Sequence, residues 1–167
     1  MMGSGTVRIW LVLMALVAAG AGAAAWLVWP RPAPVPQARQ YLNVSACLLT
    51  DSRGVVPGTP AAPVWAAMES ASTATHVMVS YLPDTGPADV TPMLGTLIQR
   101  QCGVIITTTA DASQVISAAK ADPSQHFLVV TGAGAVTTPA PENATIVAPA
   151  AAADRIDQTI HALAAQA

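Results

Sequence analysis

The chain opens with an apolar run, 9–29, that carries no charge and lies between Arg8 and Arg31. As an α-helix, this run would reach roughly 31 Å, which matches the roughly 30 Å hydrocarbon core of a bilayer. Trp10 and Trp29 would sit at the two membrane interfaces, where tryptophan is enriched. The sequence therefore predicts one transmembrane helix over 9–29, which tethers the rest of the chain to a membrane.

A cleaved secretory signal is the alternative interpretation of the same run. Such signals have an apolar region of about 7 to 15 residues followed by a small-x-small cleavage site. The alanines at 23–25 match that site only superficially, because the apolar run continues through Trp29. We therefore expect an uncleaved signal anchor. The positive-inside rule does not orient it, since Arg8 is nearly balanced by Arg31 and Arg39.

The remaining chain divides into a linker and one domain. The proline-rich segment 30–42 reads as a semi-rigid polyproline II spacer. The segment 43–167 is long enough for a single domain with a real core. A formal net charge of −2 gives no basic surface, so nucleic acid is not an expected partner.

Within 43–167, apolar runs of strand length alternate with alanine-rich helical stretches. The predicted strands are 44–49, 77–82, 104–108, 127–131 and 145–147, and the predicted helices are 62–74, 90–100, 112–121 and 150–165. Thr59, Asp89 and Asp111 suit the N-cap or first turn of the first three of these helices. Strands that are apolar on both faces predict a parallel sheet covered by helices on two sides. The expected fold is α/β, a single flavodoxin-like doubly wound parallel sheet.

The two cysteines indicate on which side of the membrane the domain lies. Cys47 lies in the first predicted strand and Cys102 directly precedes the third. In a sheet of order 2-1-3-4 these strands are neighbours, so the thiols could form a disulfide. Two buried free thiols in a reducing cytosol are the alternative. A disulfide requires an oxidising compartment, which would place 1–8 in the cytoplasm and 43–167 outside.

Several segments in order resemble one known family. The first is 46–55, in which Thr50-Asp51 is followed without a gap in spacing by Trp65 and Met68; the others are 79–83, 88–92, 101–107, 111–112 and 118–123. Together they resemble the basic membrane protein (BMP) family of purine-nucleoside-receptor-like solute-binding proteins of ABC transporters. The resemblance covers about 44–131. It implies one lobe of the type 1 periplasmic-binding-protein fold.

The departures from the family pattern concern ligand recognition. The family's Ser-Phe-Asn, whose ring stacks on the ligand and whose amide hydrogen-bonds it, is Thr59-Pro60-Ala61 here. Family members also close two lobes on the ligand, whereas this sequence corresponds to one. A single open lobe cannot enclose most of a ligand's surface, so tight nucleoside capture by one copy is not expected.

Polar residues at the carboxyl ends of the predicted strands are the candidate ligand site, because doubly wound sheets bind ligands there. The candidates are Asp51, Ser52, Arg53, Thr107, Thr108, Asp111 and Thr131. Asp51 and Arg53 could hold a polar ligand. Alternatively, Asp51 only caps its turn and Arg53 is solvated.

Other chemistry is not indicated. The glycine-rich segment 132–137 lacks the third glycine and the following helix of a phosphate loop. His76, His126 and His161 do not have metal-ligand spacing, and no nucleophile elbow or C-x-x-C motif occurs. We expect no catalytic residues, metal or cofactor.

These observations lead to a functional expectation. The chain is expected to be a single-pass cell-membrane protein whose outward-facing lobe is a binding or interaction module with a degenerate ligand site. Its expected partners are the membrane, a permease or other membrane protein, and a nucleoside-like small molecule. One alternative is a working ABC-transporter component that binds a nucleoside-like solute as an oligomer. The other is an α/β enzyme.

Overall fold

The computed structural model describes residues 40–108, 111–131 and 139–167. The predicted transmembrane helix 9–29, most of the linker 30–42 and the glycine-rich segment 132–137 lie outside the described residues. Over the described ranges, none of the helices combines the length and apolar character needed to span a bilayer.

The described chain builds one parallel sheet of five strands in the order β2-β1-β3-β4-β5. The strands are β1 (Ser45–Thr50), β2 (Met78–Pro83), β3 (Val104–Thr107), β4 (His126–Val130) and β5 (Ala144–Val147). The α-helices are α2 (Ala61–Thr75), α3 (Val90–Gln99), α4 (Ala112–Ala121) and α5 (Ala152–Ala164); the 3₁₀ turns are η1 (Pro87–Asp89) and η2 (Pro149–Ala151). The predicted α/β fold class and strand order are confirmed.

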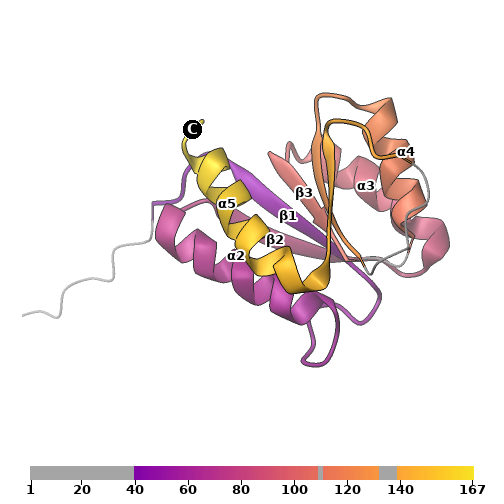
Figure 1. Cartoon of the computed structure of the whole chain (residues 1–167), viewed down its shortest axis with the longest axis horizontal. Coiled ribbons are helices and arrows are strands. Elements are labelled where there is room, and N and C mark those ends of the chain that lie inside the picture. Colours follow the sequence, from indigo (N-terminus) through magenta and orange to yellow (C-terminus); the bar gives the residue numbers. More distant parts are fainter. Residues whose placement is uncertain (1–39, 109–110, 132–138) are drawn as a thin grey trace, which may run out of the picture. The chain divides into compact units, whose positions relative to one another are not determined.

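Helices cover both faces of this sheet. Figure 1 shows α2 and α5 side by side on one face, with α3 and α4 on the other. Leu48 and Ile106 pack in the core under α2 and α5, whereas Leu49 and Ile105 pack under α3 and α4. Successive strand residues point to opposite faces, so each central strand must be apolar throughout. This is why the strands read as unbroken apolar runs.

The predicted helix starts differ in how they are built. The Asp111 carboxylate accepts a hydrogen bond from the Gln114 backbone N–H and caps α4 as predicted. Asp89 occupies the N-cap position of α3 without a side-chain cap bond. The prediction for Thr59 is wrong, because the cap of α2 is Pro60 and the Thr59 hydroxyl instead donates to loop carbonyls behind it. Thr59 thus closes the β1–α2 loop.

The two cysteines form a disulfide. Cys47 in β1 is bonded to Cys102, just before β3, and their Cα atoms are 5.8 Å apart. Both side chains are buried in the core under α3 and α4. The disulfide prediction is confirmed, and the alternative of two free thiols is wrong.

Candidate ligand site at the carboxyl edge of the sheet

A pocket of about 430 Å³ lies where the strands end. Its polar side is formed by loop and strand-end residues, Asp51, Arg53, Thr108 and Thr131. Its apolar side is formed by the end of β4 and the starts of α2 and α5: Val130, Pro60, Pro63, Val64, Pro149, Ala152 and Ala153. The volume falls within the usual range for small-molecule sites, roughly 300 to 1,000 Å³. Its position is the carboxyl edge, where sheets of this type bind ligands.

Asp51 and Arg53 form a local ion pair at the polar side. The Arg53 backbone N–H donates to Asp51 Oδ1 at 3.0 Å, and Nη2 and Nε donate to Oδ2 at 2.7 and 3.2 Å. The hydrogen bond from Arg53 lowers the pKa of the Asp51 carboxyl, so Asp51 is ionised at neutral pH. Asp51 therefore caps its own turn, while the Arg53 side chain is 62% exposed. A guanidinium has five donors, so the paired Arg53 can still bind a carboxylate or carbonyl group.

The structure brings together four of the predicted site residues and separates the other three. Asp51, Arg53, Thr108 and Thr131 line the pocket. The other three lie elsewhere: Ser52 is exposed and is not part of the lining, Thr107 is fully buried in β3, and Asp111 caps α4.

Asp111 has a structural role in the described chain. Its carboxylate accepts hydrogen bonds from the Ser113 hydroxyl at 2.6 Å and from the Gln114 side-chain amide at 2.6 Å. These bonds, that from Ser113 first, lower the pKa of Asp111. The first turn of α4 therefore already engages the carboxylate.

The apolar wall was missed by the sequence analysis. Pro60 caps α2, Pro63 lies in its first turn, and Pro149 begins the turn before α5. Proline is favoured at helix starts, and these two helices both begin at the carboxyl edge, which is the signal that could have identified the wall. Proline lacks an N–H. Pro60, Pro63 and Pro149 therefore add apolar rings to these helix starts and remove some of the amide donors that could bind phosphate.

Asp84 is a second residue that the sequence analysis missed. It directly follows β2, is 7% exposed, and its backbone N–H donates to the Thr50 carbonyl. Burial raises the pKa of the Asp84 carboxyl, and the negative charges of Asp51 and Asp89 raise it further. The described residues contain no group of three or more His, Cys, Asp or Glu side chains arranged to hold a metal ion.

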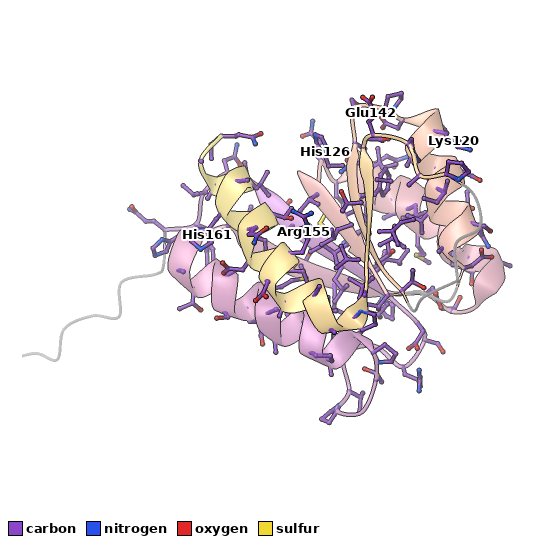
Figure 2. The ribbon with its side chains drawn as sticks, viewed as in Figure 1. Lys120, His126, Glu142, Arg155 and His161 are labelled. Atoms are coloured by element: carbon purple, nitrogen blue, oxygen red, sulfur yellow. A yellow bond between two sulfur atoms is a disulfide. The ribbon has the colours of Figure 1, made fainter. Side chains whose placement is uncertain are left out.

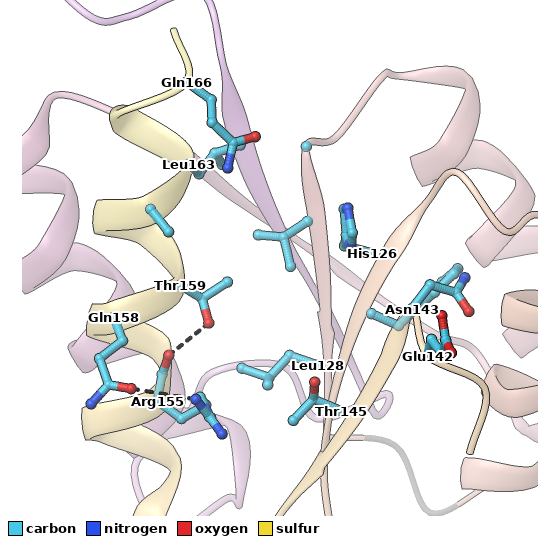
Figure 3. A pocket seen from close by; sticks show the side chains of 14 residues that line it. His126, Leu128, Glu142, Asn143, Thr145, Arg155, Gln158, Thr159, Leu163 and Gln166 are labelled. Carbon is cyan, nitrogen blue, oxygen red and sulfur yellow. Dashed lines mark hydrogen bonds between the residues drawn. The ribbon is translucent and has the colours of Figure 1, made fainter. Parts of the chain in front are cut away.

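A second cavity, also about 430 Å³, lies between α5 and the strands β3 to β5 (Figure 3). Figure 2 shows His126 and Glu142, which line it, at the opposite edge of the sheet from the strand ends. On its α5 side, the Thr159 hydroxyl donates to the Arg155 carbonyl at 2.7 Å, and Arg155 donates to Gln158 at 3.4 Å. The pocket at the carboxyl edge is the better candidate, because sheets of this type bind ligands at the carboxyl ends of their strands.

Comparisons with known proteins show the fold but not a family. No family model matches the chain, and no curated protein matches it. Among solved structures, a fragment described as a putative lipoprotein from Peptoclostridium difficile 630 aligns with a TM-score of 0.61 and 15% identity, covering 74% of this chain and 98% of that one. An ABC transporter system solute-binding protein from Aeropyrum pernix K1 aligns with a TM-score of 0.49 and 14% identity, covering 61% of this chain and 28% of that one. The first alignment shows a shared fold, and membership of the BMP family stays a prediction.

Proposed function

We propose that this chain displays a single α/β lobe on the outer side of a membrane as a non-catalytic binding module for a small amphipathic molecule. The observation that carries the proposal is the pocket at the carboxyl edge, where the Asp51–Arg53 pair lies opposite an apolar wall. Polar groups from the ends of three strands and apolar groups from the starts of two helices meet in this one place.

The lining defines the chemistry of the ligand. An apolar or flat portion would pack against Pro60, Pro63 and Val64, and a carboxylate or carbonyl group would bind Arg53. A mostly apolar pocket with a few polar groups is the usual form of small-molecule sites. Since one lobe leaves part of a ligand in water, we expect modest affinity.

The proposed location rests on the disulfide. Cys47 and Cys102 are bonded and buried in the core under α3 and α4, and structural disulfides persist in oxidising compartments outside the cytoplasm. Together with the apolar run 9–29, this supports a membrane-tethered lobe that faces outward.

A second candidate is the solute-binding component of an ABC transporter that takes a nucleoside-like solute. The BMP-like segments favour it, and so does the position of Pro60, which stands where the family has its stacking phenylalanine and lines the pocket. A proline ring supplies apolar contact without aromatic stacking. Nucleoside binding would therefore need a second lobe or a second copy.

Thermal-shift measurements on the full chain in detergent test the proposal. The panel would pair amphipathic carboxylates, such as phenylacetate and octanoate, with adenosine and guanosine. We expect a carboxylate to raise the melting temperature of the wild type, and we expect Arg53→Ala to remove that shift.

Arg155→Ala is the matched control, because Arg155 is an exposed arginine in the other cavity. A shift that survives Arg53→Ala but is lost in Arg155→Ala would move the site to that cavity and contradict the proposal. A shift with nucleosides alone would favour the transporter candidate.

A further inference from the structure

Strand β2 forms an open and uncharged edge of the sheet. Among the described residues it pairs only with β1, and its six residues, MVSYLP, include no charged side chain. The other edge strand, β5, has four residues. Soluble proteins usually block an open edge with charges, bulges or proline, because its unpaired backbone groups can pair with another chain. In β2 only Pro83, at the end of the strand, acts in this way.

The backbone of β2 presents hydrogen-bonding groups at two positions on this open side. The N–H groups of Met78 and Asp84 both donate to the β1 side, to the carbonyls of Val44 and Thr50. Because backbone groups alternate along a strand, those of Val79 and Tyr81 point away from β1. Each of these two residues offers one donor and one acceptor.

Exposed apolar side chains gather around the same edge. Over the described residues, three of the five large apolar side chains that are exposed lie in β2 or beside it: Tyr41, Met78 and Tyr81. Tyr41 and Met78 line one hollow.

The Tyr81 ring is also held in place. It packs edge-to-face against Trp65 of α2, with 5.2 Å between the ring centroids. Tyrosine and tryptophan that are fixed before binding are common anchors of protein interfaces, and an apolar patch of this kind on a soluble domain marks an interaction surface.

We propose that a second copy of this chain binds here, through antiparallel pairing of the two β2 strands about a two-fold axis at Ser80. In this register Val79 of each copy lies opposite Tyr81 of the other. Both residues point their backbone groups outward, so the two pairs complete four hydrogen bonds. Pairing in other registers would leave some of these groups unpaired.

The side chains of β2 also favour a second copy of this chain as its partner. Tyr81 of each copy would cover Val79 of the other, next to Trp65, while Met78 would lie beside Leu82 on the opposite face. Because the strand is uncharged, pairing two identical copies places no like charges directly opposite each other in the strand ladder. The result is an isologous interface, in which one patch serves both subunits.

Cysteine cross-linking in the full chain tests the register. Both native cysteines are already bonded, so each substitution adds a single free thiol. Chains carrying Val79→Cys and chains carrying Tyr81→Cys, produced together and mildly oxidised, should form a disulfide-linked dimer. Val79→Cys alone should not, because the two copies of residue 79 lie diagonally, beyond the roughly 7 Å Cα separation that a disulfide spans. Cross-linking of Val79→Cys alone would indicate parallel pairing or an antiparallel register centred on Val79, and would overturn the proposal, as would no cross-linking in any sample.

Light scattering of the full chain in detergent tests the interface independently. The wild type should be a dimer, and Tyr81→Lys should be a monomer at the same concentration, with an unchanged circular dichroism spectrum. The matched control is Ser70→Lys, which adds the same charge at an exposed position of α2 and should stay dimeric. A monomeric wild type, or a dimeric Tyr81→Lys, contradicts the proposal. Ligand binding does not enter either experiment, so the proposed function can fail while this proposal holds.

Discussion

Leu163 of α5 packs so closely on Gly103 that a Cβ at position 103 would lie 2.6 Å from Leu163 Cδ1. Gly103 precedes β3, and its N–H donates to the carbonyl of Ser45, the first residue of β1. The absence of a side chain at Gly103 therefore lets the last turn of α5 approach the central strands. The close contact joins the C-terminal helix to the middle of the sheet.

Gly103→Ala should destabilise the fold. The added methyl group must displace the terminal carbons of Leu163. Because this side chain is flexible and only half-buried, we expect a cost at the low end of the overpacking range, about 1 kcal/mol. Chemical denaturation would measure the change. Gly95→Ala is the control, since a Cβ at Gly95 in α3 meets nothing within 4 Å; it should stabilise the fold by about 0.5 to 1 kcal/mol, because alanine favours helices. Equal effects of the two substitutions would show that Leu163 moves aside without cost.

Removing the disulfide should lower stability. Cys47 and Cys102 are 55 residues apart, and a loop of this length gives roughly 4 kcal/mol in the chain-entropy model. We expect the double variant Cys47→Ala/Cys102→Ala to melt well below the oxidised wild type and to be insensitive to reductant. Reductant should lower the melting temperature of the wild type toward that of the variant. An unchanged melting temperature in both cases would contradict a stabilising role.

Asp111→Ala should lower stability at neutral pH by about 1 kcal/mol, the usual cost of losing an N-cap. The pKa of Asp111 is lowered in the folded protein. Its contribution is therefore present above the unfolded pKa, near 3.9, and is lost as pH falls through the lower folded value. Denaturation of wild type and variant between pH 7 and pH 2 should show two curves that converge in acid. Asp89→Ala, at a cap position without a cap bond, should cost less at neutral pH.

Asp84→Asn should have the opposite pH dependence. Burial raises the pKa of Asp84 in the folded protein, so the wild type loses stability as pH rises from the unfolded value, near 3.9, through the raised folded value. An asparagine oxygen can still accept from the Gly86 N–H and carries no charge. We therefore expect the variant to melt above the wild type at pH 7 and at the same temperature near pH 3. Parallel curves across this range would exclude the burial of charge as the cause.

Much of the architecture could be predicted because each element has a local signal. Apolar runs such as 104–107 have strand length, and Asp111 marks the start of α4. The strand order 2-1-3-4 is the one expected of a doubly wound sheet, and it places Cys47 next to Cys102. Pattern and chain geometry were sufficient for these features.

The site was harder to predict because its composition depends on contacts between distant segments. The apolar wall exists because α2 and α5 begin side by side, which places Pro60 near Pro149. The local sequence of neither helix indicates that the two helix starts lie side by side. Asp51 and Asp111 are the same residue type in similar loops. Only the hydrogen bonds in the folded structure show that the Asp111 carboxylate caps a helix.

The pocket at the carboxyl edge is assembled from both ends of the domain's sequence, with Asp51 and Arg53 following the first strand and Pro149 and Ala152 at the start of the last helix. During synthesis the pocket is therefore incomplete until α5 has left the ribosome and docked on α2. A molecule bound there would contact both helices and would stabilise the docked state over one in which α5 has come away. Ligand binding in the pocket and docking of α5 on α2 are thus thermodynamically linked. Hydrogen exchange in α5 would therefore report whether the pocket is filled.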